Sequence, residues 1–260
     1  MKSILIAAGL SAAALVGTAQ ATLIGDSGGG LWDYDTATNN KTLIGNTGTM
    51  FDIALDPYTN VLYGVQGSGL YTIDQTNAST ARVGTIGASI NGLTFGSDGT
   101  LYGSGGHGLY SLNKSTGAAN LIGTGAYVSS GDIAFDDAGN LFLSSSTGPL
   151  DSLWSLDINT GNGTLIGNTG YNSVYGLNYL NGTLYGFTQS GLTLTLDTLT
   201  GTGTELFNNG IAAYGADGVG GESVPEPASI ALIGLSLLGL AMSRRKVNQA
   251  GKLRLRISLI

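Results

Sequence analysis

The stretch LYGSGGHGLYSLNKSTGAANLIG, residues 101–123, holds three short apolar runs separated by glycine-rich and polar turns. Tyr110 stands in the middle run, Asn113 ends that run three residues later, and Ile122 follows nine residues after Asn113. Runs of this length, bounded by Gly, Ser and Asn, are typical of β-strands in antiparallel hairpins. The stretch therefore predicts three neighbouring strands of one sheet, joined by tight turns.

The same arrangement recurs five times along the chain. In each copy an aromatic residue or leucine is followed after three residues by Asp or Asn, and after nine more by an aliphatic residue. These positions are Trp32, Tyr71, Tyr110, Trp154 and Leu194, then Asp35, Asp74, Asn113, Asp157 and Asp197, then Ile44, Val83, Ile122, Ile166 and Leu206. The period is about 39 residues and lengthens once to 44. The longer copy carries an insertion at residues 144–152, and loops of this kind often carry function.

Two further apolar runs complete the repeat. One is seen in residues 52–55, 92–95, 132–135 and 176–179 and more weakly in 214–217, and the other in 62–64, 101–103, 141–142 and 184–186. Four short strands in a repeat of roughly 40 residues are the signature of a β-propeller. We therefore predict an all-β fold, a five-bladed β-propeller of four-stranded repeats. An open β-solenoid or a β-sandwich array is the alternative, although a solenoid coil is usually shorter than this repeat.

The ends of the repeat array predict how the ring closes. The last repeat stops after its 214–217 run, and the missing partner stands at the N-terminal end of the array as Thr22-Leu23-Ile24-Gly25. We expect this segment to pair with the Ala212–Asp217 strand, because the pairing would seal a sheet edge that is otherwise exposed. The chain shows a general resemblance to Kelch- and NHL-like propellers, without their blade fingerprints.

The first 21 residues have the pattern of a secretory signal peptide. Lys2 supplies a positive charge, residues 4–16 form an apolar core, and Ala19-Gln20-Ala21 is a small-x-small cleavage site. Cleavage there would leave Thr22 as the new N-terminus. The chain has no Cys, so an exported body needs no oxidative folding step.

A second address signal lies at the other end. Val224-Pro225-Glu226-Pro227 precedes an uncharged apolar run, residues 228–242, and the basic cluster Arg244-Arg245-Lys246 closes it. The prolines separate the body from a helix that starts near residue 228, and the basic side chains can hold its end at the cytoplasmic face. The run has 15 residues, short of the roughly 20 that a full span needs, so a buried core helix is the alternative.

This tail resembles the PEP-CTERM sorting signal of Gram-negative bacteria. The resemblance implies recognition by an exosortase-type processing enzyme and a setting in exopolysaccharide-producing bacteria. The resemblance is weakened by residues 247–260, a basic extension that is either an amphipathic segment on the inner leaflet or the product of a frame or stop-codon change.

Five segments follow from these signals. We expect a signal peptide (1–21), a β-propeller (22–221), a linker with the Val-Pro-Glu-Pro motif (222–227), a hydrophobic helix with its basic cluster (228–246) and a basic extension (247–260). The predicted route is export across the inner membrane, a precursor anchored there by the C-terminal helix, and final residence at the cell surface or outside the cell.

The charge of the body excludes one class of partner. Residues 22–221 carry three cations, Lys41, Arg82 and Lys114, against 15 acids, a net charge of −12. Nucleic acid is excluded because its phosphates would be repelled.

Candidate sites within the body are few. His107 is the only histidine and stands in a glycine-rich turn, where it cannot form a multi-histidine metal site. Asp52, Asp132 and Asp217 occupy the starts or ends of equivalent strands. If those strands line the central channel, the three acids can converge on Ca²⁺ or act as paired carboxylates in glycoside hydrolysis, but ordinary solvated strand ends are the simpler interpretation.

The repeated aromatics have two interpretations. Trp32, Tyr71, Tyr110 and Trp154 would suit sugar stacking if they lay on a rim. A residue present in every repeat is more often a packing residue between blades, and we favour packing.

Two functions remain after this survey. The favoured one is a non-catalytic surface or matrix protein whose propeller binds exopolysaccharide or another envelope partner. The alternative is a propeller hydrolase or lyase that acts on an extracellular polymer or lactone with channel carboxylates. No catalytic residue, metal ligand or cofactor is assigned from the sequence.

Overall fold

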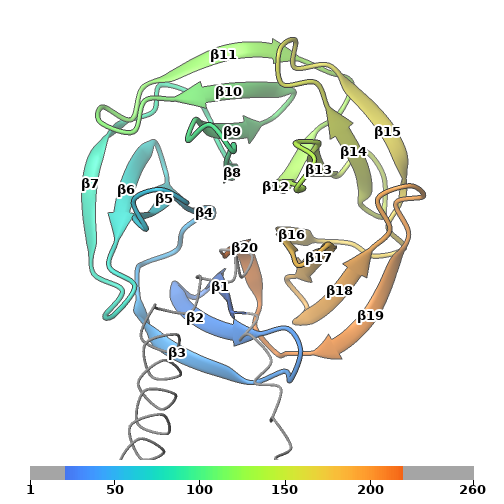
Figure 1. The fold of residues 1–260 in the computed structure, drawn as a ribbon, viewed down its shortest axis with the longest axis horizontal. Coiled ribbons are helices and arrows are strands. Elements are labelled where there is room, and N and C mark those ends of the chain that lie inside the picture. Colours follow the sequence, from blue (N-terminus) through green and yellow to red (C-terminus); the bar gives the residue numbers. More distant parts are fainter. Residues whose placement is uncertain (1–20, 219–260) are drawn as a thin grey trace, which may run out of the picture. The chain divides into compact units, whose positions relative to one another are not determined.

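The computed structural model describes residues 21–218, which form five four-stranded antiparallel sheets arranged around one central axis (Figure 1). The prediction of an all-β, five-bladed propeller is confirmed, and the open solenoid and the sandwich array are excluded. The expectations for residues 1–20 and 219–260, including the C-terminal helix, lie outside the described residues.

Each blade runs from an inner strand at the axis to an outer strand at the periphery (Figure 1). The first blade consists of β20 (Ala213–Asp217), β1 (Ala21–Asp26), β2 (Gly30–Asp35) and β3 (Lys41–Asn46). The second consists of β4 (Asp52–Leu55), β5 (Leu62–Gln66), β6 (Gly69–Ile73) and β7 (Thr80–Thr85), and the third of β8 (Gly92–Phe95), β9 (Leu101–Gly105), β10 (Gly108–Leu112) and β11 (Ala119–Thr124). The fourth consists of β12 (Ser129–Phe135), β13 (Leu141–Ser145), β14 (Ser152–Leu156) and β15 (Gly163–Asn168), and the fifth of β16 (Val174–Leu180), β17 (Thr183–Thr188), β18 (Leu192–Leu196) and β19 (Gly203–Asn208).

The ring is closed by strands from the two ends of the repeat array. β1 pairs antiparallel with β20, with Leu23 opposite Asp217 and Gly25 opposite Gly215. The predicted pairing of the N-terminal segment with the last strand is therefore confirmed. β1 begins at Ala21, and the Thr22 side chain is fully buried, with its Oγ1 accepting a hydrogen bond from Asn178 Nδ2 at 2.9 Å.

The polar landmark of each repeat is a turn residue. After β2, β6, β10, β14 and β18, one side-chain oxygen accepts the backbone N–H of the residue two positions later, at 2.7 to 2.9 Å. The side chains involved are Asp35, Asp74, Asn113, Asp157 and Asp197. This local bond defines an Asx turn, which explains why Asp or Asn is needed at every copy.

Neighbouring blades also touch at the periphery. A Cβ atom on Gly84, Gly123 or Gly167, all in outer strands, would overlap the carbonyl oxygen of a threonine in the turn of the next blade. Those threonines are Thr116, Thr160 and Thr200, each followed by glycine. The recurring Thr-Gly turn is therefore an inter-blade contact as well as a turn, and only glycine lets the two backbones approach.

We expect Gly123→Ala to lower the free energy of unfolding by about 1–3 kcal/mol, because the added methyl group must push apart two blades held in a closed ring. Urea unfolding followed by circular dichroism measures the change. Gly148→Ala is the matched control, since the nearest atom to its new Cβ lies 3.8 Å away. Equal losses in the two variants would contradict close blade contact at Gly123.

Candidate functional site

The five inner strands bring equivalent positions of the repeats to the axis. One of these positions, here called the axial position, holds an acid in β4 and β12 and a glycine in β8, β16 and β20. The residues are Asp52, Gly92, Asp132, Gly176 and Gly215. A Cβ atom on Gly215 would overlap the Asp52 carboxyl group. The glycine therefore provides the space that the buried acid occupies.

Asp52 connects two inner strands. Its Oδ1 accepts the N–H of Ile53 in its own strand at 2.7 Å, and its Oδ2 accepts the N–H of Leu93 in β8 at 2.5 Å. The side chain has no exposed surface. Asp52 therefore links the inner strands of the second and third blades through hydrogen bonds.

Asp132 makes the corresponding contacts from β12. Its Oδ1 accepts the N–H of Ile133 at 2.6 Å, while Oδ2 accepts the N–H of Leu177 in β16 at 2.6 Å and that of Ala216 in β20 at 3.3 Å. It too has no exposed surface. One carboxyl group thus joins three inner strands.

Asp217 completes the set from the end of β20. Its Oδ2 accepts the N–H of Leu55 in β4 at 2.8 Å, and its Oδ1 accepts the N–H of Gly218 at 2.7 Å. The three acids together link all five inner strands of the ring. The simpler interpretation of these acids as solvated strand ends is wrong for Asp52 and Asp132, which are fully buried. All three side chains bond mainly to backbone N–H groups of the inner strands.

Burial determines the protonation of these acids. Burial raises the pKa of Asp52 well above its usual range, and the charge and hydrogen bond of Asp132 raise it further. Burial also raises the pKa of Asp132, although the hydrogen bond from Asp52 and those from the backbone oppose the shift. Asp52 and Asp132 therefore hold a proton between them at pH values where an exposed Asp is ionised, because two neighbouring buried carboxyl groups disfavour each other's ionisation. Desolvation by the surrounding protein raises the pKa of the half-buried Asp217 to about 7.

The Ca²⁺ hypothesis gains no support from this geometry. Within residues 21–218 no three His, Asp or Glu side chains lie close enough together to hold a metal ion. The carboxylate oxygens that Ca²⁺ would require are directed at backbone donors instead.

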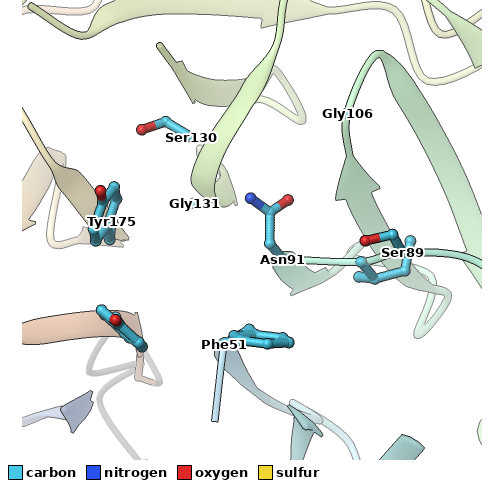
Figure 2. A pocket seen from close by; sticks show the side chains of 9 residues that line it. Phe51, Ser89, Asn91, Gly106, Ser130, Gly131 and Tyr175 are labelled. Atoms are coloured by element: carbon cyan, nitrogen blue, oxygen red, sulfur yellow. The ribbon is translucent and has the colours of Figure 1, made fainter. Parts of the chain in front are cut away.

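A cavity of about 360 Å³ opens at the mouth of the ring where the inner strands begin (Figure 2). Its lining includes the residue immediately before the axial position in all five repeats, namely Phe51, Asn91, Gly131, Tyr175 and Tyr214. Ser89, Ile90, Gly106 and Ser130 complete the lining. Because one position of each repeat contributes, the cavity is a product of the ring. We call these nine residues the mouth cavity.

Aromatic rings form part of its wall. Tyr175 and Tyr214 pack edge to face, with ring centroids 5.8 Å apart and planes at 71°. Phe51 is 41% exposed. Gly131 allows the Tyr175 backbone to approach closely, because a Cβ atom there would lie 2.5 Å from the Tyr175 carbonyl oxygen.

Polar groups also line the cavity. Ser130 donates a hydrogen bond to Asp151 Oδ2 at 3.1 Å, and the same oxygen accepts the N–H of Val174 at 2.7 Å. Asn91 Nδ2 donates to the Ser129 carbonyl oxygen at 3.1 Å, whereas the buried Asn91 Oδ1 has no hydrogen-bond partner within the part of the chain that the structure describes. The hydroxyl-bearing residues Ser89, Ser130, Tyr175 and Tyr214 thus line the cavity, whereas the unsatisfied Asn91 Oδ1 is buried in its wall.

The insertion at residues 144–152 lies beside this cavity. Its last part places Asp151, which is buried, against Ser130, and burial raises the pKa of this carboxyl. The insertion thus contacts the mouth cavity through the hydrogen bond between Asp151 and Ser130.

The repeated aromatics are packing residues. Trp32, Tyr71, Tyr110 and Trp154 lie in β2, β6, β10 and β14 and belong to the hydrophobic clusters between sheets. These contacts support the packing interpretation, which the sequence favoured over sugar stacking. The sequence did not point to the aromatic residues of the mouth cavity, because they share only their position immediately before the axial residue of each repeat.

His107 lies in the exposed turn between β9 and β10, as expected. Its Nδ1 forms a hydrogen bond with the Tyr127 carbonyl oxygen at 2.6 Å.

Comparison with solved structures supports the architecture. A chain of the nidogen/laminin complex matches with a TM-score of 0.56 and 11% identity, over 76% of this chain and 97% of that one. A structural genomics protein from Bacteroides thetaiotaomicron matches with a TM-score of 0.51 and 14% identity, over 74% of this chain and 59% of that one. A structure from a study of the de novo emergence of a symmetrical protein matches with a TM-score of 0.50 and 17% identity, over 75% and 92%. At these identities the similarity shows the fold alone.

Comparison with protein families identifies the sorting signal in the C-terminal tail. Residues 223–246 match the PEP-CTERM protein-sorting motif. The chain carries a PEP-CTERM sorting signal. The match includes Val224, Pro225, Glu226 and Pro227 and ends with the cluster Arg244-Arg245-Lys246. The PEP-CTERM motif implies processing by an exosortase and export. A search of curated proteins found no match to this chain. Over residues 21–218, no helix is long and apolar enough to cross a membrane.

We expect the free energy of unfolding to fall as pH rises from 4.5 to 7. An unfolded Asp has a pKa near 3.8, whereas the pKa of folded Asp217 is about 7, so the unfolded state releases the proton first and gains stability. The slope is at most about 1.4 kcal/mol per pH unit for each such group. Asp52, Asp132 and Asp151 act in the same direction because their pKa values are also raised.

Urea unfolding at half-unit pH intervals tests this dependence. Asp217→Asn should reduce the downward slope, because the variant lacks one titrating group. Asp197→Asn is the control, since backbone N–H groups lower the pKa of that exposed carboxyl and its proton is released below the window. A constant or rising stability between pH 4.5 and 7 would refute the assignment.

Proposed function

We propose that the protein is an exported, non-catalytic β-propeller module, displayed at the cell surface or in the extracellular matrix, that binds exopolysaccharide or another envelope partner. The PEP-CTERM motif supports the export, and the mouth cavity supports the binding. A signal peptide over residues 1–21 and a precursor anchored in the inner membrane by the C-terminal helix are parts of this proposal.

The observation that carries the proposal is the direction of β20. Tyr214, the second residue of this strand, lines the mouth cavity, and the strand ends at Asp217, at the other mouth of the ring. Residues 218–222 then lead to the sorting motif. Five residues span at most roughly 18 Å, at about 3.3–3.6 Å per residue. The chain that leads to the tail therefore leaves the described body at Gly218, which follows the end of β20 away from the cavity.

The N-terminal end leaves the body at the same place. A Cβ atom on Gly218 would lie 2.6 Å from the Ala21 carbonyl oxygen. The predicted leader and the tail are therefore joined to one side of the propeller. β1 can dock against β20 while both terminal segments are still held in one membrane.

The hydrolase or lyase alternative relied on free acids in the channel. Asp52 and Asp132 have no exposed surface, and their oxygens accept backbone N–H groups. These contacts favour a structural role for the channel carboxylates and therefore the binding module.

Mass spectrometry of the chain isolated from the cell surface and from the medium tests the export route. We expect a mature N-terminus at Thr22 and a C-terminus at or near residues 224–227. Deletion of residues 223–246 should abolish processing at the C-terminal end and change the location of the protein. An exported form whose tail reaches Ile260 would count against the sorting role.

Site-specific labelling tests the orientation, and the absence of native Cys makes it straightforward. We expect a fluorophore on Ala138→Cys, in the turn that follows β12, to be quenched by nitroxide lipids in vesicles that hold the full-length precursor. The same fluorophore on Ser89→Cys, at the mouth cavity, should be quenched much less, because the body separates it from the anchored side. Equal quenching at both sites, or stronger quenching at Ser89→Cys, would show that the propeller is not held by the mouth opposite the cavity.

A further inference from the structure

We propose that the mouth cavity binds one uncharged pyranose unit of a polysaccharide chain; this inference rests on the binding function proposed above and names its site and ligand class. The cavity of about 360 Å³ falls in the range of roughly 300–1,000 Å³ that is usual for small-molecule sites. Its position on the axis leaves it open at one end, so a sugar residue can enter while the remainder of the polymer stays outside.

Aromatic faces supply the apolar part of the recognition. Phe51 is 41% exposed although most large apolar side chains of the body are buried, and Tyr175 and Tyr214 adjoin it around the axis. Figure 2 shows Phe51, Tyr175 and Asn91 on separate elements around a common opening. The C–H face of a pyranose ring is flat and apolar, so it can pack on such rings, while the tyrosine hydroxyl groups can bond to sugar hydroxyls.

Polar groups supply orientation. Asn91 lines the cavity, and its Nδ2 donates to the Ser129 carbonyl oxygen at 3.1 Å. Its Oδ1 is buried and has no partner among the described residues, so this oxygen would accept a sugar hydroxyl after a turn of the amide group toward the cavity. On the other side of the opening, Ser130 is oriented by its bond to Asp151, which leaves its oxygen lone pairs available to accept.

Charge selects a neutral sugar over an acidic one. None of the nine residues that line the cavity is charged, and Lys41, Arg82 and Lys114 are the only cations of the body. Asp52 and Asp132 directly follow Phe51 and Gly131 in the sequence, and Asp151 stands behind Ser130. A uronate or sulfate group would therefore enter without a positive partner and close to carboxyl groups.

Isothermal titration calorimetry with the full-length chain, in a detergent that has no sugar headgroup, tests the site. The probes are cellohexaose, laminarihexaose and mannohexaose as neutral oligosaccharides, hexagalacturonate as an acidic one and a glucosamine hexamer as a cationic one. We expect saturable binding of at least one neutral hexaose, and binding of the acidic hexamer at least about tenfold weaker, which corresponds to about 1.4 kcal/mol.

Substitutions connect the binding to the cavity. Phe51→Ala should weaken the neutral hexaose about tenfold, and because Phe51 is already exposed this variant should unfold at the wild-type temperature. Asn91→Ala should weaken it severalfold. Tyr58→Ala is the matched control, since Tyr58 is a 69% exposed aromatic in the loop that follows β4, at the other mouth, and its loss should leave the affinity unchanged.

Three results would overturn the inference: no binding of any neutral hexaose, tighter binding of the acidic or cationic hexamer, or wild-type affinity in Phe51→Ala. Retention of the chain on cells and on their extracted exopolysaccharide separates this inference from the function on which it rests. If Phe51→Ala is retained as well as wild type, the module binds elsewhere and only the cavity assignment fails. If wild type itself is not retained and binds no envelope component, the proposed function fails, whatever the hexaose titrations show.

Discussion

The fold depends on satisfying the backbone of strands that have no neighbour at the axis. In every blade the inner strand pairs with one strand only, so the N–H groups on its axial side need acceptors from elsewhere. Asp52, Asp132 and Asp217 supply them, and each carboxyl reaches an inner strand of another blade. The ring is closed within the first blade by the pairing of β1 with the inner strand β20, and these carboxyl groups link the inner strands of different blades to one another.

This solution has an electrostatic cost. Carboxyl groups in a dry axial site hold their protons at pH values where an exposed Asp is ionised, and the contact between Asp52 and Asp132 adds to the effect. Gly215 is part of the same solution, because a Cβ atom there would overlap the Asp52 carboxyl group. At Gly92 and Gly176 a Cβ atom would instead meet Gly131 and Ala216 of other inner strands. A carboxyl group at the centre of a propeller is thus not in itself a sign of catalysis.

The periodicity of the sequence was sufficient to predict the architecture, since each landmark has a local cause. Asp35 and its equivalents form Asx turns, Gly123 and its equivalents admit a neighbouring turn, and Trp32 and its equivalents fill the space between sheets. Each of these contacts lies within one blade or between adjacent blades. The closure of the ring was predictable for a related reason. The last repeat of the sequence lacks a strand, and one extra strand stands at the N-terminal end of the repeat array, so the two ends complete one blade.

The mouth cavity could not be predicted from the periodicity of the sequence. Phe51, Asn91, Gly131, Tyr175 and Tyr214 share a position in the repeat but differ in type, so no recurring residue marks them. Positions that hold the same residue type in every blade pack between sheets or form turns, which every blade requires. The five residues of the mouth cavity lie around one axis but differ in type from blade to blade. Together they form one asymmetric surface. In this propeller that surface lies at the mouth where the inner strands begin. β20 leads from this mouth to the opposite one, and the PEP-CTERM motif follows in the sequence. The binding of a ligand is therefore best tested at the mouth cavity.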